Sequence, residues 1–309
     1  MFNIKISSLH LPFTINHSLL LIASAAIIWG ATAPIMKLTL TQVPVFSLAF
    51  IRMAAAALIL GLLIAKKLKI KRVDLPLFVA AAVTGVTLNL TFFFLGLKLT
   101  QAILASFLVA SVPIFTLIAA NFYLKEKLTL RLILASLVAF IGVSVIIGSP
   151  QTLSQTPGQI LGNILLLLAA LSWVAHEIIA KKLLATYDGG TVAFYSMAIG
   201  GITFLPVSIW EYLRNPAWFA GVNTTGVLGI VYGILFASLF AYWAWQKGLA
   251  KLPAGQASFF FYLDPISGAI LSIILLGEKL TLSLIIGGVL IAAGVFLAER
   301  KRKIHPLHK

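Results

Sequence analysis

Long, uninterrupted apolar stretches constrain this chain more than any other feature. Ten such runs, each of about 20 residues, follow one another along the sequence. They cover residues 18–37, 45–65, 75–95, 102–123, 129–148, 159–180, 190–210, 223–246, 254–276 and 281–298. A bilayer core about 30 Å thick needs roughly 20 apolar residues per helix, and solid runs lack the alternation of membrane barrel strands. The sequence therefore predicts an all-α integral membrane protein with ten transmembrane helices.

The composition excludes the soluble and disordered classes of protein. Hydrophobic residues make up 61% of the 309 residues and charged residues only 10%. Soluble domains carry about 25% charged residues, and disordered chains have low hydrophobicity. Cysteine is absent, which excludes disulfides, thiolate metal sites and a cysteine nucleophile.

The formal net charge of +15 has two explanations. A basic chain can bind nucleic acid, but in a membrane protein Lys and Arg collect in the cytoplasmic loops. With ten spans both termini share one side, and 18 of the 23 Lys and Arg residues fall on that side against 4 on the other. We therefore expect an inner-membrane protein with both termini in the cytoplasm, partnered by the lipid bilayer and by no nucleic acid.

The chain contains an internal repeat. Residues 96–143 align with 248–295 without a gap, and 19 of the 48 paired residues are identical. Upstream, a shift of 144 residues pairs Trp29 with Trp173. The identical residues include Glu, Lys, Pro, Gly and Trp, whereas chance similarity between Leu-rich helices would be confined to aliphatic residues. The sequence therefore predicts two homologous halves.

The repeat divides the chain into halves at 18–148 and 159–299, joined by an extracytoplasmic linker at 149–158. A lead-in at 1–17 and a basic tail at 300–309 are expected in the cytoplasm. Because each half holds five predicted helices, the second half enters the membrane from the opposite side. Inverted repeats of this kind are typical of secondary transporters, whose substrate site lies near the midplane between the halves.

The residues shared by the two copies form a recognisable pattern. Pro113 and Glu126 of the first copy recur as Pro265 and Glu278 of the second, and Trp29-Gly30 lies in the first apolar run. This pattern resembles the EamA-type branch of the drug/metabolite transporter superfamily over nearly all of the two halves. The resemblance implies the ten-helix fold and transport of amino acids, nucleobase-like metabolites or drugs, without naming a cargo.

Ionisable residues inside the apolar runs are the first candidates for a functional site, because each costs about 2.5–3.5 kcal/mol at a helix centre. Asp264 is the deepest acid and precedes Pro265, whose missing N–H frees a backbone carbonyl. Its carboxyl group could bind a proton, a cation or an amine, or stay neutral and bonded to neighbouring hydroxyl groups. Arg52 could receive a substrate carboxylate, pair with an internal acid, or reach toward the membrane interface.

A second polar group lies near the cytoplasmic end of the sixth run. Glu177 and His176 could relay a proton. Glu177 and Lys181 have i, i+4 spacing, which is more often a solvated surface pair. The eighth and ninth runs are rich in aromatic residues, some of which would line an apolar pocket while others, such as Trp245, would join an interfacial belt.

The candidate substrate or coupling residues are Asp264, Arg52, Glu177, His176, Trp29, Asn89, Tyr242 and Tyr262, and the expected helix kinks are at Pro113 and Pro265. The apolar runs contain no phosphate-binding loop, metal-ligand group or nucleophile–base pair, so we expect no enzyme, cofactor or metal. The runs at 129–148 and 281–298 are expected outside the cavity, supporting each half or forming a homodimer contact.

The EamA resemblance implies export of amino acids or related small metabolites, and the inverted repeat indicates secondary active transport by alternating access of the two halves. The alternative is a membrane scaffold or sensor that retains the fold without transporting. A wet central cavity lined by polar groups would favour transport, and a dry, fully packed interior would favour the alternative.

Overall fold

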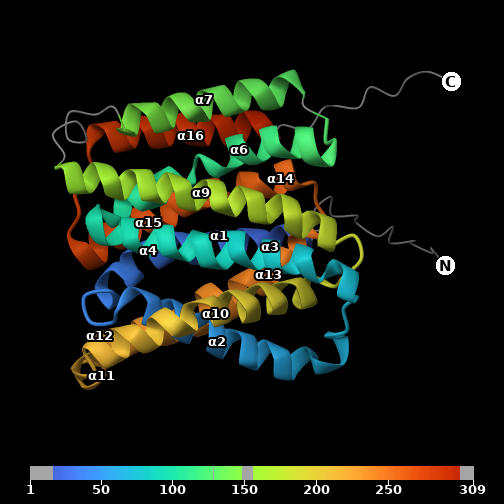
Figure 1. Ribbon diagram of the computed structural model, residues 1–309. Coiled ribbons are helices and arrows are strands. Elements are labelled where there is room, and N and C mark those ends of the chain that lie inside the picture. Colours follow the sequence, from blue (N-terminus) through green and yellow to red (C-terminus); the bar gives the residue numbers. More distant parts are fainter. Residues whose placement is uncertain (1–16, 128, 148–155, 300–309) are drawn as a thin grey trace, which may run out of the picture.

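The computed structural model describes residues 17–127, 129–147 and 156–299. The basic tail at 300–309, the lead-in apart from its last residue, and most of the predicted linker at 149–158 lie outside the described residues. Within the described ranges every regular element is helical (Figure 1). The prediction of an all-helical membrane protein is confirmed.

Eight stretches are long and apolar enough to cross a membrane. They comprise α1 (His17–Thr39); α2 (Val45–Ile64); α3 (Leu75–Ala82) with α4 (Asn89–Leu99); α5 (Ala102–Val109) with α6 (Val112–Ala119); α9 (Pro157–Leu183); α10 (Gly189–Arg214); α12 (Thr224–Tyr232) with α13 (Ala241–Leu249); and α14 (Ala254–Ser258) with α15 (Asp264–Leu276). The fifth and tenth predicted runs correspond to two helices of 18 residues each, α7 (Leu130–Ile147) and α16 (Leu282–Glu299). A short helix, α11 (Ala217–Ala220), lies between α10 and α12.

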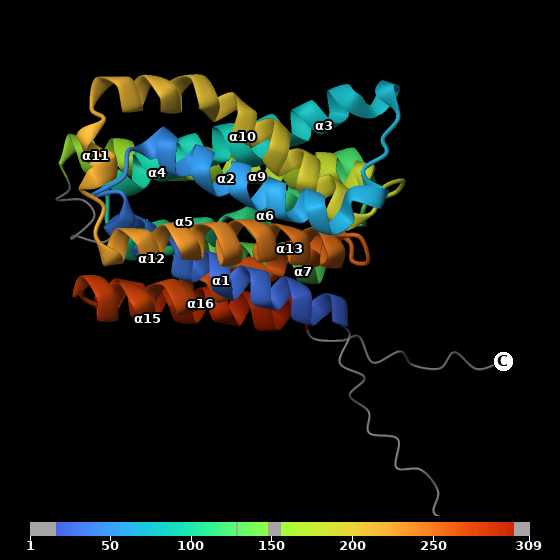
Figure 2. The ribbon, with the colours of Figure 1, turned by 90° about the horizontal axis from the view of Figure 1, so that it is seen from below.

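The helices lie roughly side by side in a bundle (Figures 1 and 2). α7 packs along α16 at one edge, and α2 packs along α10 at the other. Between these edges α1 packs against α13 and α15, and α4 packs against α9. The interior of the bundle is therefore formed by helices of both sequence halves.

Two of the spans are interrupted near their middles by proline. α5 ends at Val109, and α6 begins three residues later, at Val112, with Pro113 in its first turn. In the second half, α14 gives way to a 3-10 turn at Phe259–Leu263, and α15 begins at Asp264 with Pro265 next to it. Because proline lacks an N–H, the helical hydrogen-bond ladder is broken at both places. Such breaks leave backbone polar groups available at membrane depth.

Segments related by the repeat contact each other reciprocally. The Glu278 carboxylate accepts hydrogen bonds from the backbone N–H groups of Ala102 and the next residue, at 3.0 and 2.8 Å. The Glu126 carboxylate accepts two from Ala254 and the next residue, at 2.7 and 3.0 Å. Ala102 begins the span that ends just before Glu126. The two carboxylates therefore lie at opposite ends of the bundle, separated by a span of 23 residues.

The α7–α16 contact is reciprocal in the same way. A Cβ atom added at Gly142 would lie 2.6 Å from the Gly287 carbonyl oxygen, and one at Gly294 would lie 2.7 Å from the Ala135 oxygen. Only glycine permits so close an approach of two helix backbones. The outward faces of both helices carry exposed apolar side chains, as expected for contact with lipid.

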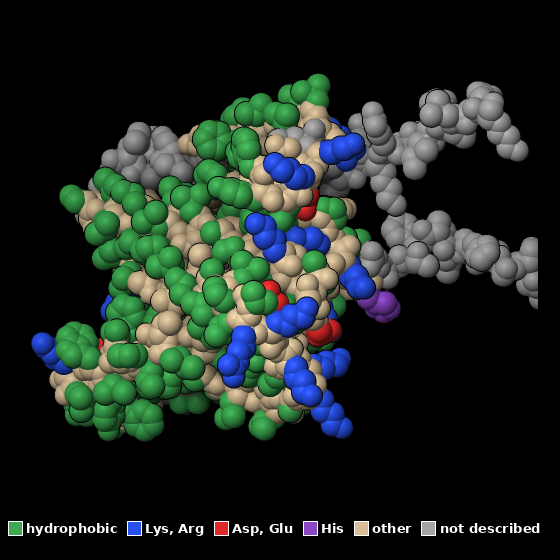
Figure 3. Space-filling view, turned by 45° about the vertical axis from the view of Figure 1, so that its right-hand side comes forward, with side chains coloured by type: hydrophobic (Ala, Val, Ile, Leu, Met, Phe, Trp, Pro, Cys, Tyr) green, Lys and Arg blue, Asp and Glu red, His purple; other side chains and the backbone are tan. Residues whose placement is uncertain are grey.

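Charged residues are unevenly distributed over the surface. Figure 3 shows that most of the visible Lys and Arg side chains gather at the end of the molecule near which α1 begins, while hydrophobic side chains cover the flank. An apolar flank with polar ends is the distribution that a bilayer requires.

Candidate functional site

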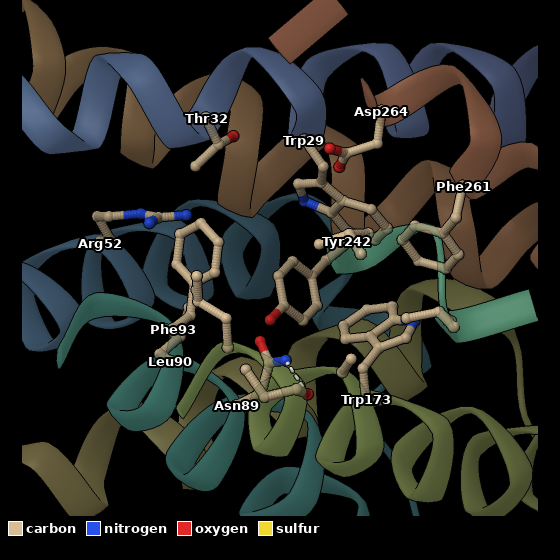
Figure 4. Close-up of a pocket in the computed structure, with 15 residues that line it drawn as sticks. Trp29, Thr32, Arg52, Asn89, Leu90, Phe93, Trp173, Tyr242, Phe261 and Asp264 are labelled. Atoms are coloured by element: carbon tan, nitrogen blue, oxygen red, sulfur yellow. Dashed lines mark hydrogen bonds between the residues drawn. The ribbon is translucent and has the colours of Figure 1, made fainter. Parts of the chain in front are cut away.

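A cavity of about 630 Å³, part of it open to the surroundings, lies inside the bundle (Figure 4). Both sequence halves contribute to its lining, which consists of Trp29, Thr32, Arg52, Asn89, Leu90, Phe93, Val109, Val112, Leu166, Ala169, Ala170, Trp173, Tyr242, Phe261 and Asp264. None of these residues belongs to α7 or α16, which agrees with their predicted place outside the cavity.

The cavity extends from the middle of the bundle toward one end. Thr32 lies about two turns before the end of α1, and Arg52 lies about two turns after the start of α2. Phe93 lies somewhat less than two turns before the end of α4. Since Ala102 follows α4 directly and contacts Glu278, the cavity extends toward the Glu278 end of the bundle.

Arg52 supplies the positive charge of the cavity. Its side chain is 2% exposed, and Nε lies 3.3 Å from both the Gly233 carbonyl oxygen and the Ser238 hydroxyl. Its guanidinium carbon lies 5.4 Å from the centre of the Phe94 ring. Within the described part of the chain, Nη1 has no hydrogen-bond partner. Arg52 does not reach the membrane interface, so that alternative is wrong.

Asp264 supplies the acidic group of the cavity. It is 4% exposed and stands at the helix break, as the first residue of α15. Figure 4 shows its carboxylate beside Trp29 at the cavity wall. Among residues 17–127, 129–147 and 156–299, no ion pair joins Asp264 to Arg52. The cavity thus holds a basic and an acidic side chain that form no direct ion pair with each other.

Aromatic rings close the cavity on the side away from Glu278. Trp29 contacts Trp173 edge-on, with 4.9 Å between ring centres, and stacks on Phe261 at 5.8 Å. Trp29 Nε1 donates to the Ala237 carbonyl oxygen at 2.9 Å. The ring centres of Trp245 and Phe261 lie 4.4 Å apart, and Trp245 is fully buried. The prediction that Trp245 joins an interfacial belt is wrong, because it packs at the centre of this aromatic cluster.

Glu177 and His176 lie outside the lining, both fully buried. Glu177 accepts a hydrogen bond from the Thr116 hydroxyl at 3.0 Å. His176 Nδ1 lies 2.8 Å from the Ala81 carbonyl oxygen and Nε2 lies 2.9 Å from Gln246 Nε2. A neutral ring protonated at Nδ1 satisfies both contacts.

Lys181 does not form the solvated surface pair with Glu177. Its ammonium donates to the carbonyl oxygens of Leu249 and Leu252, at 2.7 and 2.6 Å. Because Glu177 is fully buried, the surface-pair interpretation is wrong.

Comparison with known sequences places the chain in a family. The pattern described as "EamA-like transporter family" matches residues 17–148 and 160–299. The chain belongs to this family. An uncharacterized transporter of Archaeoglobus fulgidus is 29% identical over 287 residues, which cover 92% of this chain and 97% of that protein.

Two further relatives match over shorter segments. An uncharacterized transporter of Haemophilus influenzae is 32% identical over 37% of this chain and 62% of that protein. The uncharacterized transporter YetK of Bacillus subtilis is 26% identical over 48% of this chain and 44% of that protein. A solved crystal structure superimposes with a TM-score of 0.69 at 18% identity, covering 91% of this chain and 96% of that one. The EamA resemblance read from the sequence is confirmed, and the chain is a membrane transporter by family.

Five of the eight candidate residues meet in the cavity of this EamA-family protein: Trp29, Arg52, Asn89, Tyr242 and Asp264. Asn89 Nδ2 donates to the Ala169 carbonyl oxygen at 2.8 Å, and the Tyr242 hydroxyl donates to the Gly85 oxygen at 2.9 Å. Tyr262 lies elsewhere, buried in a separate apolar cluster that includes residues of α16.

Sequence reasoning did not select Trp173, although it is the repeat partner of Trp29 and meets it at the aromatic cluster. The repeat could have identified it as a site residue. The repeat also shows that the charges are not duplicated: the positions equivalent to Arg52 and Asp264 hold Ser196 and Val112. A pseudosymmetric scaffold therefore carries an asymmetric site.

Proposed function

We propose that this EamA-family transporter is a secondary active exporter of amino acids or related small metabolites. The observation that carries the proposal is the cavity, in which the buried ionisable side chains of Arg52 and Asp264 lie without a direct ion pair among aromatic rings. Buried charges inside a membrane protein are expensive and mark substrate or ion pathways.

The charges suit a zwitterion. A substrate carboxylate would accept parallel hydrogen bonds from the Arg52 guanidinium, which has an unpartnered Nη1 in the described residues. A substrate ammonium would neutralise Asp264. The side chain of the substrate would pack on the rings of Trp29, Trp173 and Phe261.

Transport would proceed by alternating access of two five-helix halves of opposite orientation, with α7 and α16 as the fifth and tenth spans. The reciprocal carboxylate contacts support this arrangement, because Glu126 and Glu278 are related by the repeat yet lie at opposite ends. The Lys- and Arg-rich end would be cytoplasmic, with both termini there. The cavity would then face outward, and the aromatic cluster with His176 and Glu177 would close the cytoplasmic half.

Asp264 is the proposed coupling group, which exchanges a proton for the substrate ammonium. Purified protein in proteoliposomes should move amino acids against their gradient when a pH gradient is imposed. Asp264→Asn should abolish the dependence on the pH gradient. The matched control is Tyr262→Phe, a buried polar change nearby in sequence but outside the lining.

An unchanged pH-gradient dependence in Asp264→Asn would reject the coupling role. Failure of the folded protein to bind or move any member of an amino acid mixture would reject the exporter proposal, and it would favour the scaffold or sensor alternative.

A further inference from the structure

A second hollow lies on the outside of the bundle, between α2 and α10. It encloses about 810 Å³, including space open to the surroundings, and all of its lining residues are apolar. The small residues among them are Ala54, Ala57, Gly61 and Ala198. Leu58 and Ile202 also line it and are 65% and 66% exposed. The hollow is therefore an open groove on a lipid-facing surface, separate from the central cavity.

The groove has the length of an extended acyl chain. Its lining follows α2 from Phe50 to Leu62, a rise of about 18 Å along the helix. One leaflet of the hydrocarbon core is about 15 Å deep. The groove therefore crosses one leaflet, and the lining residue that follows Leu62, Leu68, lies in the connection that leaves α2 for α3.

This connection is strongly basic. Within seven residues it carries Lys66, Lys67, Lys69, Lys71 and Arg72, all exposed. Among the described residues none of these five cations forms an ion pair. At the same end, Asp74 accepts a hydrogen bond from Tyr187, and Asp188 is paired with Lys247 at 2.6 Å.

The basic connection is held in place by α10 and the residues before it. The Thr191 hydroxyl donates to the Lys67 carbonyl oxygen at 3.0 Å, and the Tyr195 hydroxyl donates to the Leu68 oxygen at 2.7 Å. The Lys71 N–H donates to the Tyr187 hydroxyl at 3.1 Å. The two elements that form the groove thus also fix the cations at its mouth.

We propose that this site binds an anionic phospholipid, with one acyl chain in the α2–α10 groove and the phosphate headgroup on the Lys66–Arg72 connection. Orientation of the chain in the membrane accounts for basic residues on this side, but it does not require an open groove that ends among them. Basic pockets beside membrane-spanning helices bind anionic headgroups, and the effect grows with each cation. A neutral lipid would fill the groove without using the five charges.

The test is native mass spectrometry of the purified chain, titrated with phosphatidylglycerol or phosphatidylcholine of identical acyl chains. The first phosphatidylglycerol should bind about tenfold more tightly than phosphatidylcholine. The triple variant K66Q/K67Q/K69Q should remove this preference. The control K125Q/K127Q/K251Q removes three exposed cations from other connections at the same end and should keep it.

A groove variant, Ala198→Phe, should weaken binding of both lipids because its ring occupies the place of the acyl chain. Equal binding of the two lipids by the wild type would overturn the proposal, as would equal loss of preference in the two triple variants. The lysine variants change only exposed side chains, so they test the headgroup even if the groove variant fails to fold. The outcome does not depend on any transport assay.

Discussion

Arg52 gives a prediction in which stability and function move in opposite directions. Arg52→Met keeps an unbranched, flexible side chain, shorter than that of arginine, and removes a charge that is 2% exposed. A charged side chain at the centre of a membrane helix costs about 2.5–3.5 kcal/mol. The substitution gives up two hydrogen bonds at 3.3 Å and a ring contact at 5.4 Å, together about 2 kcal/mol for such long contacts.

The balance predicts that Arg52→Met is about 1 kcal/mol more stable than the wild type. For a chain of this size that corresponds to a rise in Tm of about 2 °C, measured by intrinsic tryptophan fluorescence in detergent. Binding of an amino acid should fall about 100-fold, because loss of a charge-assisted carboxylate contact costs about 3 kcal/mol.

Ser196→Ala is the matched control, since Ser196 is the repeat equivalent of Arg52 and is fully buried. It should leave both stability and binding nearly unchanged. A fall in the Tm of Arg52→Met by several degrees, with amino acid binding retained, would refute the reasoning. The guanidinium would then stabilise the packing of α2 against Gly233–Phe240, the π-helical stretch after α12.

Three further perturbations test the fold and the site. Glu278→Gln should lower the free energy of unfolding by about 1–2 kcal/mol, because it weakens two charge-assisted hydrogen bonds; an unchanged Tm would mean that the N–H groups find other partners. Burial raises the pKa of Asp188, but hydrogen bonds from Lys247 and a backbone N–H outweigh it and hold that pKa below 3.8. The contribution of Asp188 to stability is therefore present above pH 3.8 and is lost as the pH falls through the folded pKa. Asp188→Asn should therefore reduce the fall of Tm at acid pH. A Tm that falls with pH as steeply in the variant as in the wild type would contradict this assignment. Trp173→Leu should enlarge the cavity and weaken amino acid binding about tenfold, as loss of a ring contact costs about 1 kcal/mol or more; equal affinity by calorimetry would exclude the ring from the site.

The sequence predicted the helices and the charged residues of the cavity because both depend on the cost of polar groups in lipid. Asp264 and Arg52 stand out in any apolar run. What packs around them could not be predicted in the same way. Tyr242 and Tyr262 are equally aromatic and equally deep, yet only the first faces the cavity. The direction of each ring is set by the helix rotation, which depends on neighbours distant in sequence.

Local patterns were misleading where tertiary contacts overrode them. The i, i+4 spacing of Glu177 and Lys181 is typical of a water-exposed helix face, but Thr116 from another helix covers the carboxylate. Trp245 lies near the end of its span, where tryptophan favours the interface. It is buried because Phe261 contacts it from the 3-10 turn before α15. The residues next to Trp245 in the sequence do not indicate that contact.

The two glycine contacts between α7 and α16 have a consequence for how such a chain could arise. Gly142 meets Gly287, and its repeat equivalent Gly294 meets Ala135, which is the repeat equivalent of Gly287, so the interface is isologous. A single five-helix polypeptide with this helix would already be self-complementary, and two molecules of it inserted in opposite senses could pair through it. Gene duplication and fusion would then only have to tether two subunits, leaving each free to acquire its own charge.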